Sequence, residues 1–157
     1  MALAMLLFAA AQAPVRLIEE ADPITGRPTV HVVIGGKKQS IAVGCDGSKQ
    51  YKPEVIISFG HRIGGAAPAL LAGGRPMIYR LESFDPERVR WFSWKDQVIA
   101  GPFPTRPGAF IKAFMYSRSA SFRTIANDGS QLDLSFEYAR ITETIQQAME
   151  KCGVTLP

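Results

Sequence analysis

The chain has few side chains suited to holding a metal or attacking a substrate. Only two of its 157 residues are cysteines and two are histidines. No Cys-x-x-Cys or His-x-x-x-His spacing occurs, so no recognised zinc pattern is present. A Gly-x-Ser-x-Gly elbow is also missing, and carboxylates such as Asp46, Asp96 and Asp133 have no catalytic partner fixed by spacing. The sequence therefore predicts no metal, no cofactor and a non-enzymatic role.

Runs of one charge are missing too. The formal charge is +4 with a pI near 9.3, and the basic residues are scattered along the sequence. Proteins that bind nucleic acid usually gather Lys and Arg on one face, so this pattern disfavours nucleic acid as a partner. The mild positive charge is compatible with an anionic partner such as peptidoglycan or lipid head groups.

Residues 1–13 contain no charge and are mostly apolar. Residues 2–11 have the length of a signal-peptide core and are too short to span a bilayer. The alanines at 9–11 offer a small-x-small site with cleavage before Gln12, whereas cleavage after Ala13 would place Pro14 next to the scissile bond. No Lys or Arg precedes Arg16, which suggests a start upstream of Met1. A buried N-terminal helix is the alternative.

We therefore expect residues 1–11 to be a signal-peptide-like segment and residues 12–157 to form a single globular domain. This domain would be periplasmic or secreted, with no transmembrane span in the mature chain. In an oxidising compartment Cys45 and Cys152 most economically pair with each other, in preference to remaining free buried thiols.

Runs rich in β-branched and aromatic residues, bounded by turn residues, predict antiparallel strands. They cover residues 29–34, 40–43, 54–59, 77–82, 89–94, 122–126 and 132–138. Apolar spacing predicts two short helices, at residues 110–115 and 141–152. On the first strand His31 falls on the opposite face from Val30 and Val32, which favours a surface position.

The expected fold is α+β and mainly β. It is a small antiparallel β-sandwich or curled sheet with two short helices. The C-terminal helix presents Cys152 on its apolar stripe, so a bond to Cys45 at a strand end would staple the helix to the sheet.

Four residues are candidate contact residues. Trp91 and Trp94 fall on opposite faces of one predicted strand, so we expect at least one indole at the surface, although strand aromatics more often belong to a core. His61 and Arg62 lie in the glycine-rich segment 60–65, which lacks the Gly-Lys-Ser/Thr ending of a phosphate loop. The segment 64–74, small and apolar between glycines, is interpreted as either a mobile flap or a packed connection.

The order of several short motifs between Asp22 and Gly153 resembles the VasI-like (TagO-like) envelope proteins associated with type VI secretion. These motifs are an acidic-Pro entry before Thr29, a cysteine at a strand end, Val55 to Gly60, Ile78 to Leu81, Trp91 to Asp96, Phe110-Ile111, Phe122-Arg123 and a closing helix that ends Glu150 to Gly153. The resemblance implies a non-enzymatic periplasmic accessory protein that contacts secretion machinery or the cell wall. The implied partner is an envelope protein or peptidoglycan, and no catalytic residues are transferred.

Two other classes of function stay open. A secreted inhibitor of a cell-wall hydrolase would insert a loop such as residues 60–65 into a cleft. A small envelope enzyme would need folding to bring His61 close to Asp46 or Asp96, because no spacing in the sequence does so.

Overall fold

The structure is a computed structural model that describes residues 11–47, 53–63, 74–82, 84–100 and 107–156. It is made mostly of strands, with two helices. The strands are β1 (Val15–Ala21), β2 (Pro28–Gly35), β3 (Gln39–Cys45), β4 (Pro53–Phe59), β5 (Arg75–Leu81), β6 (Glu87–Trp94), β7 (Gln97–Ala100), β8 (Ser119–Ile125) and β9 (Gln131–Glu137). The helices are α2 (Gly108–Met115) and α3 (Thr142–Lys151).

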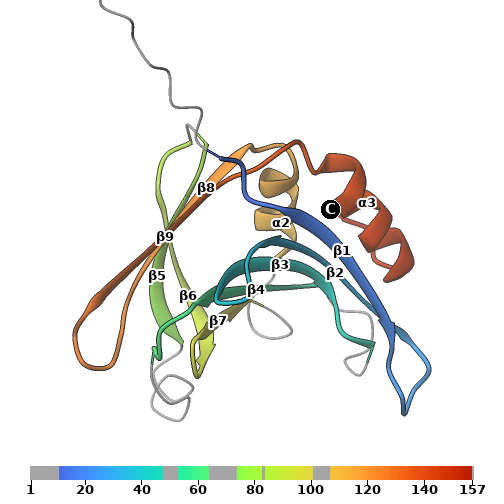
Figure 1. Cartoon of the computed structure of the whole chain (residues 1–157), viewed down its shortest axis with the longest axis horizontal. Coiled ribbons are helices and arrows are strands. Elements are labelled where there is room, and N and C mark those ends of the chain that lie inside the picture. The colour runs from blue at the N-terminus through green and yellow to red at the C-terminus, as the bar shows by residue number, and fades with distance from the viewer. Residues whose placement is uncertain (1–10, 48–52, 64–73, 83, 101–106, 157) are drawn as a thin grey trace, which may run out of the picture.

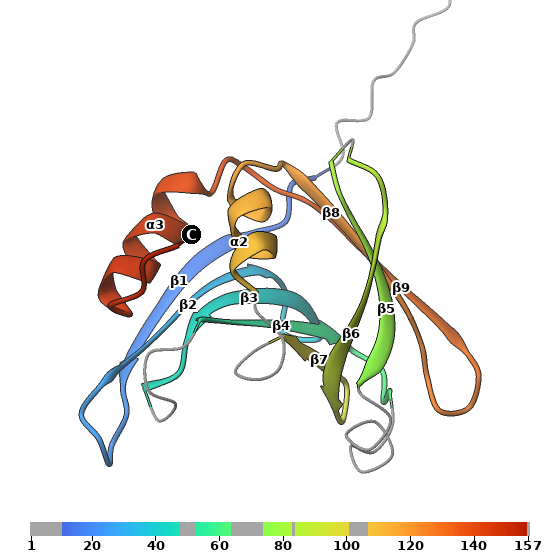
Figure 2. The ribbon, with the colours of Figure 1, turned by 180° about the vertical axis from the view of Figure 1, so that it is seen from behind.

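All nine strands belong to one antiparallel sheet in the order β1-β2-β3-β4-β7-β6-β5-β8-β9. β6 joins the two halves of the sheet, because its first part pairs with β5 and Phe92 to Trp94 pair with β7. The sheet bends strongly, and Figures 1 and 2 show both helices on its concave side. The outer side of β5, β6, β8 and β9 is thereby left without a covering layer of helices.

Alternating side chains explain which face of the sheet is buried. Val30, Val32 and Ile34 of β2 are fully buried, and Met77, Tyr79 and Leu81 of β5 point the same way, toward the helices. Phe110 and Phe114 of α2 fill the concavity, where Phe110 lies within 5.0–6.3 Å, between ring centroids, of Tyr79, Trp91, Phe114 and Phe122. α3 packs over β2 and β3 with Ile145, Ala148 and Met149 buried.

The predicted disulfide is present and joins Cys45 to Cys152 across 107 positions of sequence. Both cysteines are fully buried. Cys45 ends β3 and Cys152 is the residue immediately after α3. The bond therefore attaches the C-terminal helix to the middle of one half of the sheet, as the sequence predicted.

The mainly β fold with two helices is confirmed, and its form is the curled sheet rather than a sandwich of separate sheets. The sequence did not predict β1 or β7. β1 has six exposed residues out of seven, so it lacks the alternation that marks a half-buried strand. β7 has only four residues and follows a two-residue turn. The expectations for residues 1–10 and for 64–73 lie outside the described residues.

Candidate binding face

Four arginines gather on the outer face of strands that are separated in sequence. Arg80 of β5, Arg88 and Arg90 of β6 and Arg123 of β8 are all exposed. Arg80, Arg90 and Arg123 each lie next to a buried residue of their strand, and Arg88 shares the face of Arg90 two positions on, so alternation directs all four away from the core. We call this surface the arginine face. It consists of these four arginines together with Pro76, Ile78, Ile125 and Asp133.

The strand register explains how the arginine face is arranged. Arg88 lies opposite Ile78, Ile78 lies opposite Arg123, and Arg123 lies opposite Asp133, which forms one row across four strands. Arg90 lies opposite Pro76 in the next row. Cross-strand neighbours on one face are close enough for their side chains to interact, so the guanidinium groups surround an apolar strip.

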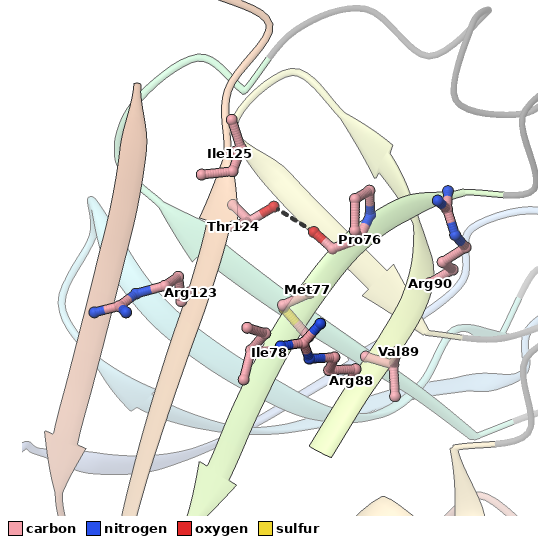
Figure 3. Close-up of a pocket in the computed structure, with 9 residues that line it drawn as sticks. All are labelled: Pro76, Met77, Ile78, Arg88, Val89, Arg90, Arg123, Thr124 and Ile125. Atoms are coloured by element: carbon pink, nitrogen blue, oxygen red, sulfur yellow. Dashed lines mark hydrogen bonds between the residues drawn. The ribbon is translucent and has the colours of Figure 1, made fainter. Parts of the chain in front are cut away.

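Two shallow hollows follow this strip. The first, of about 450 Å³, is lined by residues of β5, β6 and β8, as Figure 3 shows. The second, of about 340 Å³, continues from it and shares Ile78 and Arg123. The buried Thr124 hydroxyl donates a hydrogen bond to the Pro76 carbonyl at 2.9 Å, which fixes β8 against β5 beneath the first hollow. The strip is therefore held on paired strands rather than on loops.

The charge of the arginine face is only partly balanced. Arg123 donates two hydrogen bonds to Asp133, at 2.6 and 3.1 Å, and these bonds hold the pKa of Asp133 below its usual value. Arg90 donates to the Gly74 carbonyl at 3.0 Å. Within the described part of the chain no hydrogen bond or ion pair involves the side chain of Arg80 or Arg88. Of the described residues that line the two hollows Asp133 is the one acid, so this part of the face has a net positive charge.

The candidate contact residues from the sequence have different positions. His61 and Arg62 are exposed, just before the buried Ile63. The backbone of Ile63 accepts a hydrogen bond from Asn127, two residues beyond Ile125, so this segment lies near one end of the arginine face. His61 and Arg62 therefore remain predicted contacts.

The prediction that Trp91 is available for contact is wrong. Its side chain is only 5% exposed, because it turns to the concave side and packs edge-on against Phe110 with 5.3 Å between ring centroids. Trp94 lies in β6 opposite Gln97, and its side chain is outside the described part of the structure. The sequence missed the clustering of Arg80, Arg88 and Arg123, although the i, i+2 spacing of Arg88 and Arg90 was a visible signal.

A second polar feature lies on the outer face of the other half of the sheet. His31 of β2 and Glu54 of β4 both flank Gly44 of β3 in the register. The His31 Nε2 atom is 3.0 Å from the Glu54 Oε1 atom, and the two side chains are 15% and 3% exposed. His31 is on the predicted face of its strand, but it is less exposed than the sequence indicated, because it reaches over Gly44 to a buried carboxylate.

Gly44 is expected to be intolerant of any side chain. A methyl group there would lie 1.8 Å from the Val30 carbonyl oxygen and 2.8 Å from the His31 Cα atom. Gly44→Ala should therefore lower the free energy of unfolding by roughly 3 kcal/mol, measured by urea denaturation. Gly36→Ala is the matched control because a methyl group there meets nothing within 4 Å. Equal stability of the two variants would contradict this packing.

Among the residues that the structure describes, no group of three or more His, Cys, Asp or Glu side chains is placed to hold a metal ion. The described helices are all too short to cross a membrane. The fold and the face together define a disulfide-closed protein with a curled antiparallel sheet that carries the exposed arginine face. Comparison of the chain with protein-family models, with curated proteins and with solved structures finds no match.

Proposed function

We propose that this protein is a non-enzymatic accessory protein of the periplasm that binds an acidic segment of another envelope protein through the arginine face. The observation that carries the proposal is the gathering of four arginines and one aspartate around an apolar strip on paired strands. Guanidinium groups recognise carboxylates with two parallel hydrogen bonds, so such a surface suits carboxylate-bearing partners.

An extended peptide fits the strip better than a compact ligand. Arg88 and Arg90 are two residues apart on one strand, which separates their Cα atoms by about 6.6–6.8 Å. An extended segment with an acidic residue at every second position repeats at the same spacing. The hollows are shallow and continue into each other through Ile78 and Arg123, so they offer length rather than depth.

Other observations support the proposed periplasmic location and the proposed association with type VI secretion. The Cys45–Cys152 disulfide fits an oxidising compartment, because cytosolic thiols are kept reduced. The order of motifs between Asp22 and Gly153 supports an association with type VI secretion through its resemblance to the VasI-like proteins. An acidic segment of a secretion component is therefore the proposed partner.

The test is affinity capture from an envelope extract of the cells that naturally produce this protein, followed by titration of the purified partner. We compare the native chain with Arg88→Glu/Arg90→Glu and with Lys37→Glu/Lys38→Glu, which makes the same charge change in the exposed β2–β3 turn. The arginine variant should bind the captured protein at least about tenfold more weakly, and the lysine variant should bind normally apart from a small salt-sensitive change. Thermal melting checks that each variant is folded.

The outcomes separate the classes of function. A secretion component lost only by the arginine variant supports the proposal. Equal retention by all three proteins would contradict it. Binding to purified cell-wall sacculi without any protein partner would assign the face to peptidoglycan, and inhibition of a muramidase would favour the inhibitor.

A further inference from the structure

β1 is an edge strand, and no other described strand pairs with its free edge. It is the first strand in the sheet order and pairs with β2 alone among the described strands. Leu17 and Ile18, which point to opposite faces, are 37% and 39% exposed. Soluble proteins usually protect such an edge with charges, because unpaired backbone groups otherwise recruit another strand. β1 does carry charges, and their order along the strand is the informative feature.

The charges of β1 are self-complementary about Ile18. Arg16 lies two residues before Ile18 and Glu20 lies two residues after it, all on the same face of the strand. If two copies of this strand run antiparallel with Ile18 opposite Ile18, Arg16 of each copy faces Glu20 of the other. Opposite charges directly across a strand pair stabilise it. We propose that a second copy of this chain pairs its β1 with β1 in this register, which joins two sheets into one.

The backbone allows this register. Residues that lie opposite each other in an antiparallel pair must both point their N–H and C=O groups toward the partner or both point them away. In the proposed register, opposing positions such as 16 and 20 are an even number of residues apart, so they match. A shift of one residue would oppose positions that do not match. A shift of two residues in one direction leaves both arginines facing Ile18. In the other direction it opposes Arg16 to Asp22, whose carboxylate already accepts hydrogen bonds from the backbone and hydroxyl of Thr25, and it opposes Glu20 to Ile18.

The contacts that β1 side chains make within the chain leave donors and partners for this pairing. Arg16 Nη2 donates to the Gly35 carbonyl at 3.3 Å, which uses one of its five N–H donors and holds the side chain in its own sheet. On the other face Glu19 is paired with Lys151 of α3, so the carboxylate that would lie beside Leu17 of the second copy already has a cation. The interface is small, and we expect a micromolar dissociation constant.

The experiment measures the mass of the oxidised chain by sedimentation equilibrium across the micromolar range, with Arg16→Glu, Glu20→Arg and their double variant. Arg16→Glu places two pairs of like charges across the interface, and Glu20→Arg does the same with the opposite sign. Each should raise the dimer dissociation constant at least about tenfold. An equal mixture of the two single variants regains complementary pairs, as does the double variant, so both should dimerise again. Lys37→Glu controls for the change of net charge.

Each outcome is decisive. Restored dimers in the mixture and in the double variant support the β1 register, because loss of folding cannot produce such rescue. A native chain that stays monomeric throughout would overturn the proposal. Dimers that neither charge reversal weakens would place the interface elsewhere. These variants leave the arginine face unchanged, so failure here does not affect the proposed binding function.

Discussion

Removing the disulfide by Cys152→Ser is expected to lower the free energy of unfolding by about 4 kcal/mol, which for a chain of this size lowers the melting temperature by roughly 10–15 °C. The bond closes a loop with a sequence separation of 107, and long loops restrict the unfolded chain most. Its loss also frees α3 from the end of β3. Differential scanning calorimetry measures the change.

The control variant distinguishes the loss of the disulfide from the effect of the free Cys45 thiol that Cys152→Ser creates. Cys152→Ser leaves Cys45 as a free thiol at a fully buried site, whereas Cys45→Ala/Cys152→Ala leaves neither a thiol nor a hydroxyl group. Both variants should melt close to the native chain measured with reductant. If native, reduced and double-variant proteins all melt together, α3 docks without help from the bond. The disulfide would then contribute nothing measurable to stability.

The half-buried strands and both helices were predictable because each carries its own periodic pattern. Val30, Val32 and Ile34 alternate with less buried residues, and Ile145 and Met149 mark one stripe of α3. β1 has no such pattern because it is the edge of the sheet, where β2 pairs with it on one side and most of its side chains remain exposed. The choice between a sandwich and a curled sheet depends on β6 pairing with β5 along one part and with β7 along another. Local sequence carries no signal for that choice.

The candidate site was less predictable than the fold. A composition with scattered arginines indicated no basic patch, yet strand pairing places Arg88 of β6 and Arg123 of β8 on either side of Ile78. Trp91 was expected as a possible surface contact but is buried, because its face of β6 is the one that α2 covers. Alternation predicts which residues share a face of one strand. The pairing order and the covering layer decide which faces combine and which of them meets solvent.

The aromatic cluster behind the arginine face leads to the second large expected effect. Phe110 contacts Tyr79 of β5, Trp91 of β6 and Phe122 of β8, which are the strands that carry the four arginines on their outer side. Its side chain is only 4% exposed. Phe110→Ala should therefore lower the free energy of unfolding by about 3–5 kcal/mol, measured by urea denaturation.

The same substitution tests whether the cluster positions the arginine face. A cavity beneath the three strands lets them shift relative to one another, so Phe110→Ala should weaken binding of the captured envelope partner even where the variant remains folded. Phe84→Ala removes a phenyl ring of the same size from a site that is 62% exposed, and it should change stability by less than about 0.5 kcal/mol and leave binding intact. Destabilisation by Phe110→Ala with unchanged binding would show that β5, β6 and β8 keep their outer surface without the ring. The backbone pairing of β5 with β8, together with the hydrogen bond from the Thr124 hydroxyl to the Pro76 carbonyl, would then suffice to arrange the arginines.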